Sequence, residues 1–390
     1  MIKPPIQKVI LVLGANAGQA DLIRHMKLNN WYVVCCSHRN GEVGELLADE
    51  FYCIDIKDVK SVVTLAQSIK ADLVYSVSSD IAITSSVSAS EVLKTNHFFN
   101  SDLVDLFNNK SRMRNFLNSH NLGYVKYSTI KSDVEVEDWD LFPCIVKPVD
   151  SQGQRGVQLI NSKDNLCHAV KIALKLSEKR NAIVEEFLDG IEISCNVLMQ
   201  NGICLFDVLS ERLVHGGELT GIPRGHLVPC VNVSLKNINN SLELVRKIVE
   251  ALGIKNGCLY FQMKVTSKGI RVIEIAPRLD GCHMWRLIKH ATGHNYLANT
   301  INTLIDKSSN IESRPAVKLG DFYELIFQQA PLNSSFYKSE HPTPVDSLYH
   351  EYRYLDGDRI NPVNGKLEIV GYYVRKLLPK DLKAHKISDE

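Results

Sequence analysis

The sequence of 390 residues lacks long hydrophobic runs, which excludes the stretches of about 20 apolar residues that cross membranes. The N-terminal stretch MIKPPIQKVILVLGANAGQ holds only about eight apolar-leaning residues, so we predict a buried strand there and not a secretion signal. Long basic runs are also absent. The 45 Lys and Arg are balanced by 44 Asp and Glu, which gives a net charge of +1. We therefore expect neither a membrane nor a nucleic acid as a partner.

The ten cysteines lack the spacing of a metal site or of a disulfide framework. Cys35 and Cys36 are adjacent, the others are scattered, and no C-x-x-C pair or Cys/His ligand pattern occurs. Disulfides belong to secreted proteins, and no secretion signal is predicted here. The sequence therefore predicts reduced cysteines in a cytoplasmic protein.

Neither common nucleotide-binding fingerprint is present, since the chain has no G-x-x-x-x-G-K-[ST] and no G-x-G-x-x-G between a strand and a helix. The N-terminal turn VLGANAGQ places Gly14 and Gly18 between a strand and a helix, but the next strand ends in Cys36 and Ser37 where an acidic residue would bind a ribose. Arg39 could meet the extra phosphate of NADP, which leaves an NADP-dependent oxidoreductase as an alternative. A turn shaped only for packing or for a non-nucleotide ligand is the favoured interpretation.

An alternation of apolar strands and helices is what the first part of the chain does contain. We expect strands at residues 7–13, 31–36, 51–55 and 73–77, and helices at 18–28 and 58–69. Strands that alternate with helices at this spacing predict βαβ units and a parallel open sheet that ends near residue 105.

The rhythm changes after a helix at 110–119, whose Met113, Phe116 and Leu117 share one face. The strands expected beyond it lie at 143–148, 156–160, 182–186, 192–199, 203–210, 258–266 and 270–275, and the helices at 164–176, 240–252, 284–291 and 295–306. Because these strands follow one another with the helices set aside, they predict antiparallel α+β modules.

The stretch VKPVDSQGQRGV has the composition of a glycine-rich hairpin tip with Lys147 at its base. Backbone amides around Ser151, Gly153 and Gly156 could close over phosphate oxygens, while the lysine ammonium neutralises their charge. Taken alone, a surface hairpin with a solvated lysine is the more common structure.

Acidic residues downstream favour the nucleotide hypothesis. In AIVEEFLDGIEIS an apolar strand leads to Glu185 and Glu186, then to Phe187 and Leu188, with Glu192 on the next strand. The exposed backbone between the two strands could bind an adenine edge, and the later carboxylate could accept from ribose hydroxyls.

Two later strands joined by a tight turn place Gln262 and Glu274 across from each other. Oxygen ligands on facing strands suit Mg²⁺, and Glu274 lies inside an apolar run where a charge needs a partner. Arg278 follows four residues later, where it could stabilise a transferring phosphoryl group.

In this order the residues resemble the ATP-grasp superfamily, and the specific motifs occupy residues 110–281. The resemblance implies an α/β and α+β fold with a Rossmann-like domain at 1–105, an ATP-grasp domain of two α+β lobes at 106–308, and a C-terminal α+β segment at 309–390. Its lid subdomain would cover about 122–188, and ATP with Mg²⁺ or Mn²⁺ is the implied cofactor.

The resemblance also implies residue roles. The implied nucleotide contacts are Lys110, Lys147, Ser151, Gly153, Gly156, Glu185, Glu186, Phe187, Leu188 and Glu192; the metal ligands are Gln262 and Glu274; the catalytic residues are Arg278 and Lys147. Two positions depart from the pattern, since Gln262 stands where related ligases often have Glu, and Ala276 replaces a metal-binding Asn.

Within the superfamily, the sequence most resembles carbamoyl phosphate synthetase-like carboxylate–amine ligases, including L-amino acid ligases. This implies ATP-dependent activation of a small carboxylate as an acyl phosphate and its transfer to an amine, with amino acids among the candidate substrates and a homodimer as the family default. The candidates to hold a substrate carboxylate are Arg212, Arg224, His226 and Arg286. A nucleotide-binding protein without ligase activity is a further alternative, because Ala276 removes one metal ligand.

Overall fold

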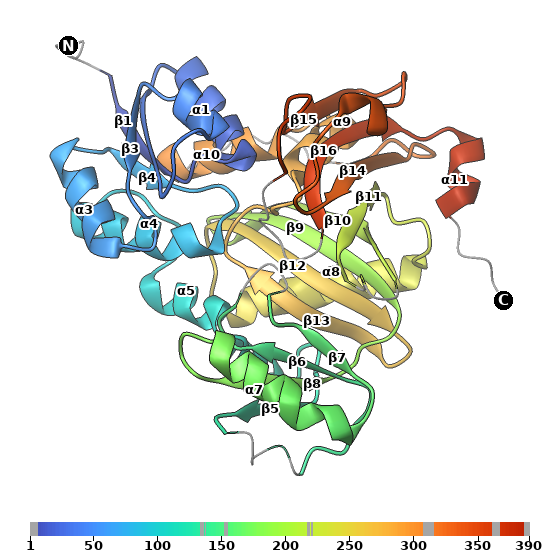
Figure 1. Ribbon diagram of the computed structural model, residues 1–390. Coiled ribbons are helices and arrows are strands. Elements are labelled where there is room, and N and C mark those ends of the chain that lie inside the picture. Colours follow the sequence, from blue (N-terminus) through green and yellow to red (C-terminus); the bar gives the residue numbers. More distant parts are fainter. Residues whose placement is uncertain are drawn as a thin grey trace.

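The computed structural model describes residues 7–132, 136, 138–151, 155–216, 219, 221–306, 316–360 and 367–385. Its strands form three sheets, which Figure 1 shows as an N-terminal layer in blue, a small sheet at the bottom in green and a large central sheet. Within these described ranges, no helix is long and apolar enough to cross a membrane. Gly153 of the expected glycine loop lies outside the described residues.

The N-terminal sheet is parallel, with the strand order β3-β2-β1-β4. Its elements are β1 (Val9–Leu13), α1 (Ala17–Leu28), β2 (Tyr32–Ser37), α2 (Val43–Leu47), β3 (Glu50–Cys53), α3 (Val59–Ser68), β4 (Leu73–Tyr75) and α4 (Asp80–Leu93). Every residue of the central strand β1 is buried, as its continuous run of Val, Ile and Leu predicts. The predicted parallel open sheet is therefore confirmed.

Helix α4 was not expected from the sequence, because serines interrupt its apolar pattern. Ser85 and Ser86 are nevertheless buried, and their hydroxyls donate to the carbonyl oxygens of Ile56 and Val74. A serine that satisfies its hydroxyl in this way can pack inside a core, but hydrophobic periodicity does not reveal it.

The small sheet, which we call the lid, is antiparallel with the order β5-β8-β6-β7. Its elements are β5 (Tyr127–Ile130), β6 (Cys144–Pro148), β7 (Gln158–Ile160), the short 3-10 helix η2 (Lys163–Asn165), α7 (Leu166–Leu176) and β8 (Ala182–Glu186). Helix α7 packs its buried face on this sheet and completes a separate apolar core. Helices α5 (Ser101–Asn108) and α6 (Lys110–Ser119) connect the N-terminal sheet to the lid.

The large sheet has eight antiparallel strands in the order β13-β12-β9-β10-β11-β14-β16-β15. Its strands are β9 (Ile191–Gln200), β10 (Ile203–Val214), β11 (Pro223–Val228), β12 (Gly257–Thr266), β13 (Gly269–Ala276), β14 (Tyr323–Pro331), β15 (Tyr349–Tyr352) and β16 (Leu367–Lys376). The accompanying helices are α8 (Leu235–Ala251), α9 (Met284–Thr292), α10 (Tyr296–Asp306), the 3-10 helix η4 (Lys338–Glu340) and α11 (Pro379–His385). The C-terminal strands extend the same sheet as β9–β13, and the exact domain boundaries stay predictions.

The side chains of β9 alternate between two environments. Ile193 and Cys195 enter the apolar core that α8 covers, whereas Glu192, Ser194 and Asn196 are buried on the opposite face. We call this second side of the sheet the polar face. It carries most of the predicted site residues.

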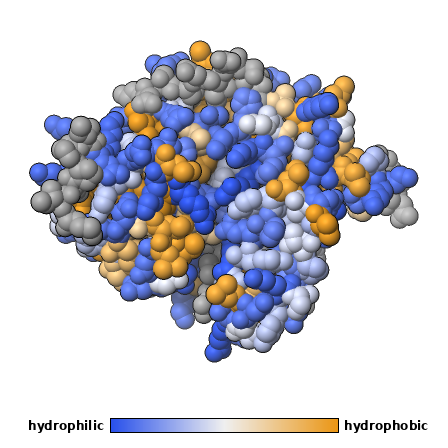
Figure 2. Space-filling model, turned by 90° about the horizontal axis from the view of Figure 1, so that it is seen from above, coloured by the Kyte–Doolittle hydropathy of each residue, from blue (hydrophilic) through white to orange (hydrophobic). Residues whose placement is uncertain are grey.

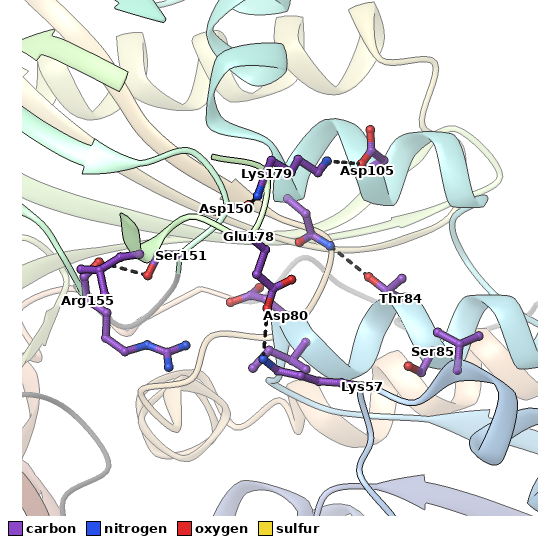
Figure 3. Close-up of a pocket in the computed structure, with 14 residues that line it drawn as sticks. Lys57, Asp80, Thr84, Ser85, Asp105, Asp150, Ser151, Arg155, Glu178 and Lys179 are labelled. Atoms are coloured by element: carbon purple, nitrogen blue, oxygen red, sulfur yellow. Dashed lines mark hydrogen bonds and ion pairs between the residues drawn. The ribbon is translucent and has the colours of Figure 1, made fainter. Parts of the chain in front are cut away.

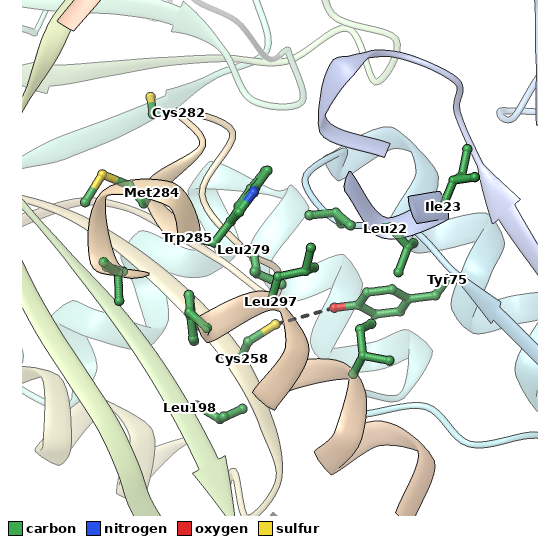
Figure 4. Close-up of a cluster of buried hydrophobic side chains, with 14 of the residues drawn as sticks. Leu22, Ile23, Tyr75, Leu198, Cys258, Leu279, Cys282, Met284, Trp285 and Leu297 are labelled. Atoms are coloured by element: carbon green, nitrogen blue, oxygen red, sulfur yellow. Dashed lines mark hydrogen bonds between the residues drawn. The ribbon is translucent and has the colours of Figure 1, made fainter. Parts of the chain in front are cut away.

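An apolar core also joins the N-terminal sheet to the large sheet (Figure 4). Leu22 and Tyr75 lie in the same cluster as Leu279 and Trp285, and the Tyr75 hydroxyl lies 3.6 Å from the Cys258 sulfur. This shared core fixes the segment between β13 and α9 over the polar face. On the face that Figure 2 shows, apolar residues lie in separate groups among hydrophilic ones.

The turn between β8 and β9 depends on Gly190, which has φ of +86° and whose added Cβ would overlap the carbonyl oxygen of Val265. We predict that Gly190→Ala lowers the free energy of unfolding by about 3 kcal/mol, from left-handed strain and overlap together. Gly202→Ala is the matched control, because Gly202 has φ of +80° but open space around it, and should lose about 1 kcal/mol. Urea unfolding followed by circular dichroism measures both, and equal losses would contradict the close contact at Val265.

Candidate active site

The candidate site lies where β8 of the lid leads into β9 of the large sheet (Figure 1). Lys110 begins α6, directly after the N-cap Asn109, and its Nζ donates to the carbonyl oxygen of Ser151 at 2.6 Å. The predicted phosphate lysine therefore reaches the base of the glycine loop. Gly156, at the other end of that loop, has φ of +75°, and a Cβ at this position would lie only 2.7 Å from Leu176 and 3.0 Å from Pro148.

Lys147 lies in a buried cluster of three charges. Its Nζ is 2.5 Å from Glu185, whose other oxygen accepts from Arg114 Nε at 2.5 Å. Burial lowers the pKa of Lys147, and the attraction of Glu185 opposes this. Burial raises the pKa of Glu185 less than the charges of Arg114 and Lys147 lower it, so this pKa lies at about 2. Two cations on one carboxylate leave a net positive charge, which suits a phosphate.

Arg114 was missed by the sequence analysis, although a signal for it exists. It is buried with Met113 and Leu117 on the inner side of α6, and its guanidinium also donates to the carbonyl oxygens of Val272 and Ile273. A charged residue on the buried stripe of a helix implies a buried counter-charge. Periodicity alone could not identify Glu185 as that partner, because the two residues lie on different elements.

The predicted adenine segment is held by its neighbours. Glu186 exchanges backbone and side-chain hydrogen bonds with Lys126, and the Phe187 N–H donates to the carbonyl oxygen of Pro143 at 3.2 Å. The carbonyl oxygen of Leu188 accepts from Lys264 Nζ at 3.0 Å. These contacts fix the segment at the junction of lid and large sheet, and its binding to adenine stays a prediction.

Glu192 is buried on the polar face, where its Oε1 lies 2.8 Å from Arg212 Nε and accepts from Gln262 Nε2. Both contacts use Oε1, so Oε2 can accept a further donor such as a ribose hydroxyl. The predicted ribose carboxylate and one predicted metal ligand are therefore direct neighbours.

The predicted metal ligands are brought together, because Gln262 and Glu274 are paired residues on β12 and β13. Gln262 uses its amide nitrogen for Glu192, which leaves its oxygen for a cation. Glu274 is half-buried, and its carboxylate has no hydrogen bond or ion pair within the described ranges. Two oxygen donors fit Mg²⁺ when phosphate oxygens and water complete the shell, and Ala276 contributes none.

Arg278, the predicted catalytic arginine, is held by Asp80 at the first turn of α4. The guanidinium makes two parallel hydrogen bonds to this carboxylate, donates to the carbonyl oxygen of Leu279 at 2.9 Å and lies over the Tyr260 ring. Asp80 was not anticipated. It lies five residues after the last residue of β4, and ligand-binding residues gather beyond the carboxyl ends of parallel strands, which is the signal that could have identified it.

Two of the four candidate substrate residues lie together on the polar face, because Arg212 of β10 is paired with His226 of β11. Arg224 is exposed on the same strand as His226. Arg286 lies elsewhere, on α9, and its guanidinium is bound to the buried Asp21 of α1. That pair joins two helices, and a substrate contact by any of the four stays a prediction.

The N-terminal glycine turn is occupied by contacts within the protein. Asn16 accepts from the N–H groups of Gly18 and Gln19, which are the donors that would otherwise face a phosphate. Arg39 pairs with Glu42 at 3.0 Å. These contacts support the packing interpretation of the turn over NADP binding.

A cleft of about 400 Å³ separates the N-terminal sheet from the lid near Ser151 (Figure 3). Charged residues of both signs line it, and Lys57 crosses it to reach Glu178 at 3.4 Å. Lys179 forms a second crossing pair with Asp105. Exposed pairs of this kind add about 0–1 kcal/mol each, so they do not lock the lid to the N-terminal sheet.

Glu185 should make stability depend on pH. Its pKa of about 2 in the folded protein lies below the ordinary value of 4.5, so its stabilising effect is complete above about pH 5 and is lost as the pH falls towards 2. Between pH 5 and pH 3, wild type should lose about 2 kcal/mol more of its free energy of unfolding than Glu185→Gln does. Chemical denaturation at each pH measures this, with Glu250→Gln, an exposed carboxyl on α8, as the control. Parallel curves for wild type and Glu185→Gln would contradict the assignment.

A family profile described as an ATP-grasp domain matches residues 141–285. The carbamoyl phosphate synthase large chain of Caldanaerobacter subterraneus subsp. tengcongensis is 23% identical over 234 residues, which is 58% of this chain and 21% of that protein. The chain thus spans about a fifth of the length of this relative.

Solved structures share the fold over the chain. An L-amino acid ligase from Bacillus licheniformis has a TM-score of 0.78 at 15% identity and covers 97% of this chain and 96% of that one. An N5-carboxyaminoimidazole synthetase from Staphylococcus aureus, complexed with ADP, has a TM-score of 0.75 at 18% identity, with coverage of 97% and 96%. The profile covers most of the lid and the strands that carry the predicted metal ligands, and the predicted fold class is confirmed. Residues 141–285 therefore match an ATP-grasp domain, and the chain has the fold of these solved structures.

Proposed function

We propose that the protein is an ATP-dependent ligase that joins a small-molecule carboxylate to an amine. The observation that carries this proposal is the pairing of Gln262 and Glu274, two oxygen donors on neighbouring strands, close to Arg278. The Glu274 carboxylate makes no ion pair among the described residues and lies near an arginine. This arrangement suits a phosphoryl group that is bound to a metal ion.

Relatives support the proposal at the level of reaction type. The structural neighbours include an L-amino acid ligase, and the sequence relatives include a formate-dependent phosphoribosylglycinamide formyltransferase of Bacteroides thetaiotaomicron, 24% identical over 76% of this chain. When bound, ATP with Mg²⁺ supplies the phosphoryl group that turns a carboxylate into an acyl phosphate.

Each residue of the site has a defined task under this proposal. Glu274 and the oxygen of Gln262 hold the metal ion, and Glu192 accepts from the ribose through its free oxygen. Lys110 and Lys147 neutralise phosphate oxygens at the lid. The lid excludes water, which would otherwise hydrolyse the acyl phosphate.

Arg278 stabilises the charge that develops on the transferring group. Asp80 accepts from Nε and Nη2 along one edge of its guanidinium, so the arginine is already oriented before substrates arrive. Because Arg278 needs no rearrangement, its donors act at the moment of phosphoryl transfer. Mutation of Asp80 would therefore act through Arg278 and not through substrate contact.

The finer assignments follow the same proposal. The substrates are small carboxylates and amines, with amino acids as the first class to test, and the protein works in the cytoplasm as a homodimer. The alternative is a nucleotide-binding protein without ligase activity, which Ala276 suggests because it removes one oxygen ligand.

The test is ADP release in the presence of pooled carboxylates and amines, with the product identified by mass spectrometry. Wild type should release ADP and form a ligated product, and Glu274→Gln should lower kcat/KM by about 100-fold or more, since the metal loses its charged ligand. Glu243→Gln, which changes an exposed residue on α8, should retain wild-type activity. ATP binding without substrate-dependent ADP release would favour the nucleotide-binding alternative.

A further inference from the structure

A closed group of polar side chains lies on the polar face between the large sheet and the segment that follows β13. Its floor consists of Asn196, Ser194, Ser210 and His226, and its cover contains Asp280, all at most 3% exposed. We call these residues the buried polar cluster. Their contacts indicate a ligand that none of the predicted roles includes.

The orientation of His226 is set by the strands beneath it. Its Nδ1 lies 3.1 Å from the Ser210 hydroxyl and 3.5 Å from the Ser194 hydroxyl, and the two hydroxyls are 2.8 Å apart. The Nε2 atom is buried and has no partner among the described residues. When Nδ1 carries the proton and donates to Ser210, Nε2 presents a free lone pair.

Two more side chains of the cluster have buried atoms without partners. Asp280 accepts from the Cys282 N–H through Oδ1 at 3.0 Å, but its Oδ2 has no hydrogen bond within the described part of the chain. The amide of Asn196 is fully buried and uses neither its oxygen nor its nitrogen. Buried polar atoms are normally satisfied, so these unpaired atoms, each within the same cluster, call for a ligand.

The charge of the cluster selects the kind of ligand. Burial and the nearby Arg212 lower the pKa of His226 well below its usual value, which keeps the imidazole neutral. Burial raises the pKa of Asp280 more than the charges of Arg212 and Arg278 lower it, and its carboxyl group makes no ion pair in the described residues, so it disfavours a second carboxylate. The cluster therefore suits a hydrogen-bond donor such as an amine better than the carboxylate for which His226 was first considered.

A metal ion is the rival occupant, because donor atoms of His226, Asp280 and Cys282 lie within 4.8 Å of one another. Two observations disfavour it. Arg212 Nη1 lies 3.6 Å from the Cys282 sulfur, and burial raises the pKa of that thiol to about 12. A metal ion would need the Cys282 thiolate as a ligand at a position that the Arg212 guanidinium already occupies. An amine needs only Asp280 and His226.

The cluster adjoins the site of phosphoryl transfer. Asp280 is two residues after Arg278, and both Asp280 and Glu274 act electrostatically on the Arg278 guanidinium. An amine held at Asp280 would therefore lie close to Arg278, which the proposed function places at the transferring phosphoryl group.

We propose that Asp280, His226 and Asn196 form the subsite for the amine substrate, an inference that rests on the proposed ligase function. The amine enters as an ammonium ion that donates to Asp280 Oδ2, with Asn196 binding a neighbouring polar group of the same substrate. His226 Nε2 accepts a hydrogen bond from the ammonium, and Asp280 Oδ2 takes one proton from it, since burial raises the pKa of this carboxyl group. The neutral nitrogen then attacks the acyl carbon, the C–N bond forms, the C–O bond to phosphate breaks, and phosphate leaves with the bonding electrons and the second proton.

The experiment separates the activation of the carboxylate from the use of the amine. Hydroxylamine, which is neutral near pH 7, captures acyl phosphates as hydroxamates without needing Asp280. With the carboxylate found in the pooled incubation, Asp280→Asn should raise the KM for the amine about 10- to 100-fold and leave hydroxamate formation and the KM for ATP within about twofold of wild type. Asp207→Asn is the matched control, since Asp207 lies on the other face of β10, where it pairs with Arg246.

His226→Gln provides the second variant and carries the test if Asp280→Asn does not fold. It should lower kcat for amide formation about 100-fold with little change in hydroxamate formation, because only the amine substrate depends on His226 Nε2 to orient its nitrogen. Equal losses of hydroxamate and amide in these variants would overturn the proposal, as would wild-type kinetics in both. Purification of wild type with one equivalent of zinc that Cys282→Ser loses would overturn it in favour of the metal. Wild type that forms neither product would contradict the ligase function itself.

Discussion

The two-residue alternation of β9 and β10 is the constraint on which the rest of the structure depends. Apolar side chains such as Ile193 and Cys195 enter the core beneath α8, and this burial fixes the register of the strands. The same register places Glu192, Ser194 and Asn196 on the polar face. A slip of one residue would exchange the two sets and remove the site, so the core and the chemistry are specified by one pattern.

The charges around the site follow a second pattern. Three of its cations are tied to carboxylates within the protein: Lys147 to Glu185, Arg278 to Asp80 and Arg212 to Glu192. These pairs orient the cations before any ligand binds, because an ion pair in a buried site leaves little freedom to either side chain. Glu274 and Asp280 are carboxylates of the site that make no such pair among the described residues. Each is proposed to bind a cationic ligand: Glu274 the metal ion and Asp280 the substrate ammonium.

Elements with a clear apolar pattern were predicted from the sequence, whereas elements with a short or interrupted pattern were not. Long apolar runs such as 182–186 and paired strands such as β12 and β13 were predicted within one or two residues, because burial on a strand leaves a direct signal. Helix α4 and strand β11 were not predicted. In α4, buried serines interrupt the apolar pattern. Strand β11, PRGHLV, is short, and its position in the core depends on its neighbours β10 and β14.

By itself, the sequence determined which residue types stand at which spacing: a lysine before a glycine loop, a carboxylate after a short turn, and an amide and a carboxylate on adjacent strands. Local geometry links such residues, so spacing is enough to predict them. Only the tertiary structure decided the long-range partners, including Arg114 with Glu185, Asp80 with Arg278, and Asp280 above His226. Those pairs join elements far apart in the chain, and their contacts arise from the packing of sheets against one another, which no local pattern of residues encodes.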